Sequence, residues 1–244
     1  MTETKTRILV WDTPTRVFHW MFALCFAGAY ATSESERLIG VHTTLGYTMA
    51  GLVMFRLIWG LIGPRYARFT SFLRGPETIA HYVNALWSGK SEHPVGHNPL
   101  GAISITLMLL SSPIIVYTGW VYFHGGSHII KEVHESAAGL MLAIISVHVA
   151  GVLLACVVQG ENLIASMIHG YKTGSPTAAI RWTWWPIAAL VLGSVLGFWW
   201  LQWQSPPSAA PTRQDGKSQR HHGEHERHGK LSKHSGYNGH DDGD

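Results

Sequence analysis

Hydrophobic positions gather in long uninterrupted blocks along the first 204 residues, with short polar segments between them. A helix needs about 20 predominantly apolar residues to cross the hydrocarbon core of a bilayer. Five blocks are of that length, over about residues 13–32, 38–62, 98–123, 132–158 and 182–203. The pattern predicts an all-α membrane protein: a transmembrane four-helix bundle with an added fifth transmembrane helix.

Local signals set the ends of several of these helices. Thr13 is expected to cap the first helix, with Pro14 at its first helical position. Gly63 and Pro64 end the second helix. Pro113 should kink the third, which membrane helices tolerate.

Segments outside the spans differ in character. Within the polar loop 64–97, aromatic and aliphatic residues recur at helical spacing over Glu77–Trp87, which predicts a short helix on the membrane surface. After Ser205 the chain is polar and rich in Gly, Pro and His, so it is expected to be disordered. We divide the chain into a membrane domain (1–172), a linker with the fifth span (173–204) and a tail (205–244).

Composition and charge place the protein in a membrane. Of 244 residues, 46% are hydrophobic, 14% are charged and 11 are tryptophan, a residue enriched at membrane interfaces. The first residues show no signal-peptide cleavage site. With a cytoplasmic N-terminus, nine Lys and Arg residues fall on the cytoplasmic side and only Arg37 and Lys131 in the outer loops. The positive-inside rule favours this orientation, which puts the tail on the outer side. Lipid is the expected surrounding, and no nucleic acid is expected as a partner.

Four histidines fall inside the predicted spans. His134 and His148 are fourteen residues apart on the fourth, so they share one helix face at a separation of ~21 Å. In the predicted topology His42 lies near the outer side with His134, and His19 near the inner side with His148. Ionisable residues at membrane depth usually have a function. The alternative is that these histidines are hydrogen-bonded to neighbouring helices.

Two imidazoles that face each other across a helical bundle are what a six-coordinate haem requires. Two such pairs predict two non-covalent haems b, and the absence of a Cys-x-x-Cys-His motif excludes covalent attachment. With both axial positions of the iron filled, electron transfer is favoured over catalysis at the metal. Zinc fits less well because it needs three or four ligands at one point.

Arg56 is also a candidate haem contact. It lies fourteen residues after His42, on the same helix face and at the depth of His148. A buried arginine requires an anionic partner such as a haem propionate. The alternative is that Arg56 reaches the inner headgroups. Arg16, one turn before His19, is expected to meet lipid phosphates.

Several separated motifs stand out between residues 10 and 172. They are Asp12–Arg16 with Phe18-His19-Trp20, Gly46-Tyr47 after His42, Phe55–Gly60, Gly63–Arg65, His97–Gly101, and His134-Glu135 ahead of His148. Together they resemble prokaryotic cytochrome b561 proteins and the cytochrome b subunits of nickel-iron hydrogenases.

The resemblance implies a four-helix bundle that holds two b haems through His19, His42, His134 and His148. It implies a location in the bacterial inner membrane, with the tail in the periplasm. It also implies electron transport in the respiratory chain, between the diffusible membrane quinone and a periplasmic cytochrome c or a hydrogenase. The fifth span and the histidine-rich tail depart from the family. The identity of the redox partner therefore stays open. A homodimer and membership of a quinone oxidoreductase complex are both compatible with the sequence.

Two alternatives remain from the residues. The first is a quinone-reducing oxidoreductase that takes electrons from a small oxidant such as superoxide. The second is a membrane protein that handles divalent metal, because short His-rich tracts bind Zn²⁺, Cu²⁺ and Ni²⁺. The tail histidines are His221, His222, His225, His228, His234 and His240.

Overall fold

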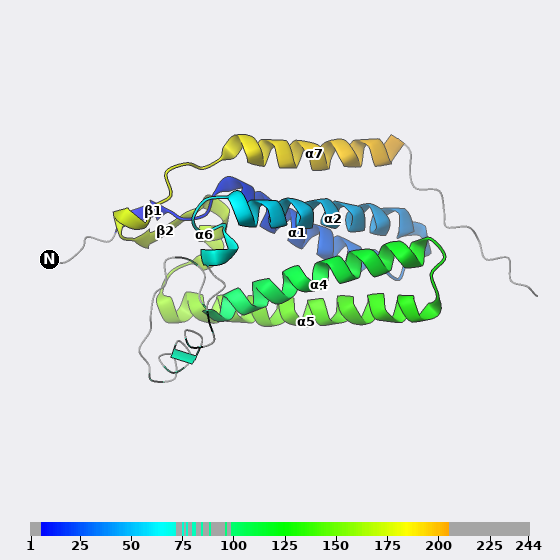
Figure 1. Cartoon of the computed structure of the whole chain (residues 1–244), viewed down its shortest axis with the longest axis horizontal. Helices are drawn as coiled ribbons and strands as arrows, with labels where there is room; N and C mark the ends of the chain where they lie inside the picture. The colour runs from blue at the N-terminus through cyan, green and yellow to red at the C-terminus, as the bar shows by residue number, and fades with distance from the viewer. Residues whose placement is uncertain are drawn as a thin grey trace, which may run out of the picture. The chain divides into compact units, whose positions relative to one another are not determined.

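In a computed structural model, five long helices run side by side (Figure 1). The structure describes residues 6–71 and 99–204, with isolated positions between them at 75, 77, 80, 81, 84, 88 and 96. The long helices are α1 (Thr13–Thr32), α2 (Ile39–Ile62), α4 (Pro99–Phe123), α5 (His128–Gln159) and α7 (Trp185–Gln204). The predicted all-α bundle is confirmed.

The helices pack in chain order. α1 packs against α2, α2 against α4, and α4 against α5. α7 packs against α1 and α2, on the side away from α4 and α5 (Figure 1). The fifth helix is therefore an addition to one flank of a four-helix arrangement.

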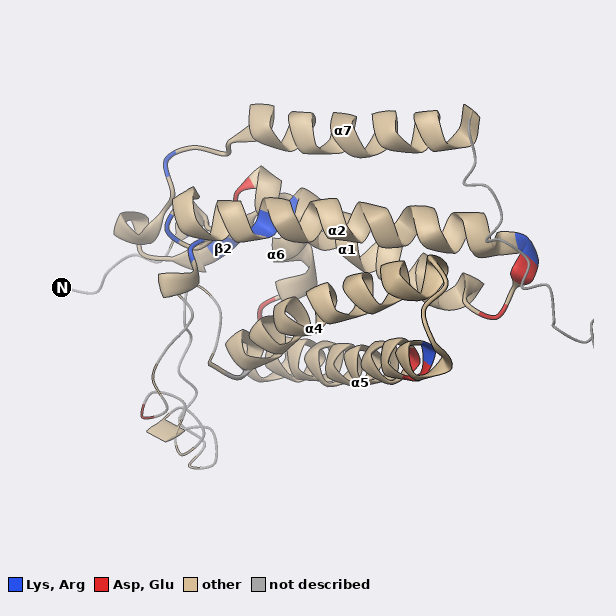
Figure 2. Ribbon diagram, turned by 45° about the vertical axis from the view of Figure 1, so that its right-hand side comes forward, with Lys and Arg blue, Asp and Glu red and all other residues tan. Residues whose placement is uncertain are grey.

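Within the described residues, four segments are long and apolar enough to cross a membrane: Glu36–Ile62, Gly101–Phe123, His128–Gln159 and Trp185–Gln204. α1 has 20 residues but carries Arg16 and His19 in its first two turns, so it is less apolar. Charged residues gather toward the ends of the bundle, and the bodies of α4, α5 and α7 are almost bare of them (Figure 2). This distribution is typical of a protein surrounded by lipid.

Two predicted helix starts are corrected by the structure. The N-cap of α1 is Asp12 rather than Thr13, because the Asp12 carboxylate accepts hydrogen bonds from the Thr15 backbone N–H at 3.0 Å and the Thr15 hydroxyl at 2.9 Å. α5 begins at His128, one turn before the predicted Glu132, and its N-cap is Ser127. The predicted surface helix over Glu77–Trp87 falls largely outside the described residues, and the tail does so entirely.

A small subdomain, called the cap below, lies at one end of the bundle and consists of two strands and a short helix. The sequence pattern did not predict its strands. β1 (Thr6–Leu9) pairs antiparallel with β2 (Tyr171–Gly174), which follows the short helix α6 (Leu163–His169). Ile8, Val10, Trp11 and Tyr66 form its apolar core. The cap joins the start of the chain to the segment that follows α5.

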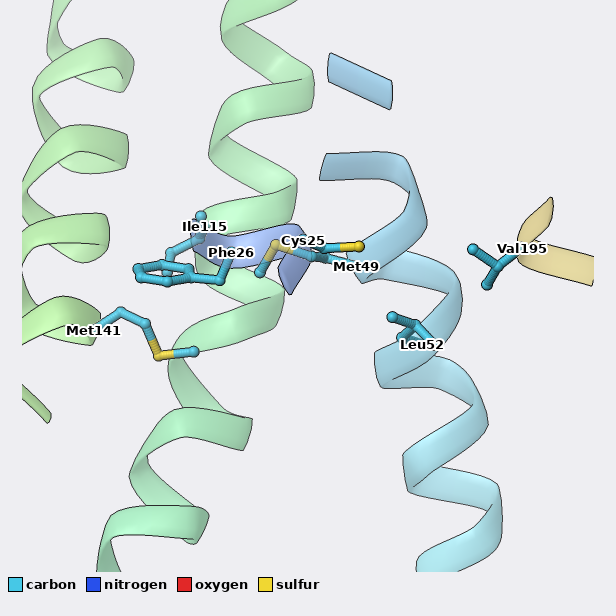
Figure 3. Close-up of a cluster of buried hydrophobic side chains, with 7 residues drawn as sticks. All are labelled: Cys25, Phe26, Met49, Leu52, Ile115, Met141 and Val195. Atoms are coloured by element: carbon cyan, nitrogen blue, oxygen red, sulfur yellow. The ribbon is translucent and has the colours of Figure 1, made fainter. Parts of the chain in front are cut away.

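A buried apolar cluster occupies the middle of the bundle (Figure 3). Each of the five long helices contributes to it, and Met141 and Cys25 are completely buried. Its members are Cys25, Phe26, Met49, Leu52, Ile115, Met141 and Val195. Met141 lies seven residues after His134 and seven before His148, so this cluster lies between the depths of the two histidine pairs.

Candidate redox centres in the bundle

Two of the predicted histidines lie together near one end of the bundle. His42 comes from the first turn of α2 and His134 from the second turn of α5. Their ring centroids are 6.1 Å apart and their planes are inclined by 73°. Helices α2 and α5 are thus held so that their imidazoles are neighbours.

Each of these two rings is oriented by a backbone carbonyl of a third helix. His42 Nδ1 lies 2.8 Å from the Ala29 carbonyl oxygen of α1, and His134 Nδ1 lies 2.9 Å from the Ile115 carbonyl oxygen of α4. A carbonyl oxygen only accepts, so each Nδ1 must carry the hydrogen. The lone pair of each ring is then on Nε2, which is the atom that can bind a metal.

The other two histidines are neighbours as well. His19 on α1 and His148 on α5 are close enough to interact electrostatically. Within the described residues, the buried Nδ1 of His19 has no hydrogen-bond partner. Among the described residues, His19 therefore lacks the carbonyl support seen on both histidines of the outer pair.

Arg56 is buried, with only 3% of its surface exposed. Its Nη1 donates to the Ala67 carbonyl oxygen at 2.8 Å, and the guanidinium lies 5.3 Å from the Phe69 ring centre. It also interacts electrostatically with the carboxylate of Asp12. A side chain this deeply buried does not extend to the headgroups, and its propionate contact stays a prediction.

Asp12 is a buried carboxylate, 1% exposed, whose role the sequence reasoning missed. Besides capping α1 through Thr15, it accepts a hydrogen bond from the indole N–H of Trp59 on α2 at 3.0 Å. It is also the electrostatic neighbour of Arg16 and Arg56. The position of Asp12 directly before Thr13-Pro14 indicates an N-cap, because aspartate is a preferred N-cap residue. The sequence prediction assigned the cap to Thr13 instead.

Arg16 is directed into the protein rather than toward lipid phosphates. It donates to the carbonyl oxygen of Ile168 at 2.6 Å and to the Thr13 hydroxyl at 3.1 Å. Ile168 lies in the last turn of α6, where backbone carbonyls lack helical partners and attract cations. The arginine thereby fastens α1 to the cap.

The cap holds a buried lysine beside an acidic residue. Lys172 Nζ lies 3.7 Å from a carboxylate oxygen of Glu161. Burial lowers the pKa of Lys172, and the nearby Glu161 carboxylate opposes that shift. Glu161 also accepts from the Thr173 backbone N–H at 2.7 Å, so the pair fixes β2 against the end of α5.

The two imidazoles of His42 and His134 suit a metal whose other ligands come from a cofactor. Metal–imidazole bonds are about 2 Å long, so one metal between two imidazoles puts the ring centres about 6 Å apart. The 6.1 Å spacing of His42 and His134 is of that size. In the described part of the chain no group of three or more His, Cys, Asp or Glu residues could hold a metal ion by itself. Two axial nitrogens match the needs of an iron already held by a porphyrin.

Comparison with known proteins identifies the family. The family described as prokaryotic cytochrome b561 matches residues 10–170, which contain α1, α2, α4 and α5. A probable Ni/Fe-hydrogenase 1 B-type cytochrome subunit of Escherichia coli (strain K12) is 20% identical over 213 residues, covering 67% of this chain and 90% of the relative. A probable Ni/Fe-hydrogenase B-type cytochrome subunit of Rhodobacter capsulatus is 23% identical, covering 69% and 82%. No solved structure matches significantly.

Proposed function

Because the chain belongs to the prokaryotic cytochrome b561 family, it is an integral inner-membrane b-type cytochrome that transfers electrons, and we propose that two bis-histidine haems carry them across the membrane. The proposed route runs between the quinone pool and a partner redox protein. Haem supplies the one-electron chemistry when bound, and the protein supplies ligands, spacing and surroundings.

The geometry of His42 and His134 is the observation that carries this proposal. Each imidazole donates its Nδ1 hydrogen to a carbonyl of another helix, which fixes the ring and leaves Nε2 as the ligand atom. A histidine that served only to join helices would gain nothing from a second imidazole at 6.1 Å. In this proposal the hydrogen bonds to neighbouring helices orient the two ligands.

For the second haem we propose His19 and His148 as ligands. His148 is on the same face of α5 as His134, ~21 Å further along the helix. Asp12 and Arg56 lie at this inner end, and Arg56 is the proposed contact for a propionate of this haem. Its positive charge would stabilise the reduced form of the cofactor.

The apolar cluster around Met141 has a part in this proposal. It lies between the depths of the two ligand pairs, and its members are buried, which disfavours water there. Dry surroundings lower the cost of rearranging solvent when an electron arrives, and they keep the two centres separate. Helices α1, α2 and α5, which carry the proposed ligands, all contribute side chains to this cluster.

We propose that β1, β2 and α6 lie on the cytoplasmic side and that the end of α7 lies on the periplasmic side. The basic residues Arg7, Arg65, Arg68 and Arg181 are at the cap end of the bundle, as the positive-inside rule expects. The outer haem between His42 and His134 would then be the one nearer a periplasmic partner.

Hydrogenase is the partner that the relatives' names suggest, since they are described as B-type cytochrome subunits of Ni/Fe-hydrogenases. A periplasmic cytochrome c is the other partner we propose, on the resemblance to prokaryotic cytochrome b561 proteins. Among the described residues nothing favours chelation of a bare divalent ion over haem.

A haem count tests the proposal. Acid acetone should extract all haem from the purified full-length protein, and the pyridine haemochrome assay should give two haems b per chain. One haem per chain would refute the two-centre assignment, and a colourless protein would refute the proposal as a whole.

A further inference from the structure

Gly119 on α4 stands directly against the imidazole of His134. A Cβ atom built on Gly119 would lie 2.8 Å from His134 Cε1 and 3.1 Å from its Nδ1. Carbon atoms in contact are about 3.5–4.0 Å apart, so any larger residue would push the ring away. Glycine is therefore the residue that lets this histidine reach the α4 backbone.

Close approach gives His134 a defined set of polar neighbours. Its Nδ1 lies 2.9 Å from the carbonyl oxygen of Ile115, which is one helical turn before Gly119, and 3.3 Å from the hydroxyl of Thr118. Thr118 directs its own hydrogen to the Ile114 carbonyl at 2.7 Å, so its oxygen presents lone pairs to the ring. Thr118 and Gly119 thus contact the same imidazole, one through its hydroxyl and the other through close backbone approach.

We propose that Gly119 is a positioning residue for the outer haem: it sets the orientation and the basicity of the ligand His134, and through them the midpoint potential of that haem. This inference rests on the bis-histidine assignment of the proposed function. It assigns to α4, which provides no ligand of its own, the control of one of the two centres.

The physical link is the hydrogen bond to Ile115. A histidine ligand that donates its outer N–H to a carbonyl becomes more basic, and ligand basicity tunes the metal. A more basic ligand favours the ferric state and lowers the midpoint potential. Displacement of the ring by a Cβ at position 119 would lengthen the 2.9 Å contact, so the outer potential should rise.

Comparable glycines in the bundle lack this relationship. A Cβ at Gly51 of α2 or at Gly139 of α5 would meet nothing within 4 Å, and a Cβ at Gly28 of α1 would meet only Leu45. Gly139 lies on the same helix as His134 and is exposed. Gly139→Ala is therefore a matched control for the change from glycine to alanine in a membrane helix.

The test measures both midpoint potentials of the full-length protein in detergent by spectroelectrochemistry. The outer wave is assigned from His148→Ala, which should keep the outer haem alone. Gly119→Ala should move the outer wave to higher potential or reduce total haem to about half, and leave the inner wave unchanged. Thr118→Val keeps the volume and removes one polar contact to His134, so it should shift the outer wave in the same direction by a smaller amount.

The inference is overturned if both midpoint potentials of Gly119→Ala equal those of the control Gly139→Ala. Equal loss of both haems in Gly119→Ala, with both waves unmoved in Thr118→Val, overturns it as well, since this would show a general folding defect. Equal loss together with an outer shift in Thr118→Val supports it. Failure of the proposed function is seen separately, as one haem or none in the unmodified protein.

Discussion

Replacement of Asp12 by alanine should destabilise the inner end of the bundle by about 3 kcal/mol. The carboxylate caps α1 through Thr15 and accepts from the buried indole of Trp59. Loss of an N-cap costs about 0.5–2 kcal/mol. A buried N–H left without its acceptor costs about 1–3 kcal/mol. Arg56 also loses its carboxylate neighbour, so the inner haem should dissociate more readily than the outer one.

Thermal unfolding in detergent, followed by haem absorbance and circular dichroism, provides the measurement. A loss of about 3 kcal/mol should lower the apparent melting temperature of Asp12→Ala by roughly 10 °C. Asp12→Asn keeps one acceptor oxygen and should lose about half as much. Glu36→Ala removes an exposed carboxylate and should stay within about 0.5 kcal/mol of the unmodified protein. The reasoning fails if Asp12→Ala melts together with Glu36→Ala.

Three further predictions concern the haems. His42→Ala and His134→Ala should each remove the outer haem, whereas His19→Ala and His148→Ala should each remove the inner haem. Each variant should retain about half of the haem. If His42→Ala and His148→Ala abolish the same redox wave, the pairing is wrong. The haem that remains in His148→Ala should have a lower midpoint potential than the one that remains in His134→Ala, since both outer ligands donate Nδ1–H to a carbonyl; equal or inverted potentials would contradict this. Truncation after Gln204 should leave the haem spectrum and both potentials unchanged, and loss of one haem would place a tail histidine at iron.

The sequence predicts the helices well because the membrane imposes a simple rule on composition. Long apolar blocks gave the bounds of α1 and the C-terminal ends of α2 and α4. The helix α5 begins one turn before its predicted start, because polar residues such as His128 and Lys131 do not belong to the apolar block that predicts the helix. The β1–β2 pairing could not be predicted, because it joins two four-residue segments more than 160 residues apart.

The proximity of the four histidines was predictable from the sequence, but the groups that orient two of them were not. Helical spacing alone puts His134 and His148 on one face, and topology puts His42 at the depth of His134. The carbonyl groups of Ala29 and Ile115 belong to the backbone, and a sequence carries no mark of which carbonyl accepts a side chain. Gly119 resembles any other glycine of a membrane helix until its distance to the imidazole is known.

The pairing of β1 with β2 also imposes a parity on the chain. Two strands that share hydrogen bonds must be on the same face of the membrane, so the chain between Leu9 and Tyr171 must cross the bilayer an even number of times. Among the described residues of that interval, α2, α4 and α5 qualify by composition. With α1 as the fourth crossing, despite its polar first turns, the number is even. A further crossing by α7 then predicts that Gln204 and β1 lie on opposite faces of the membrane.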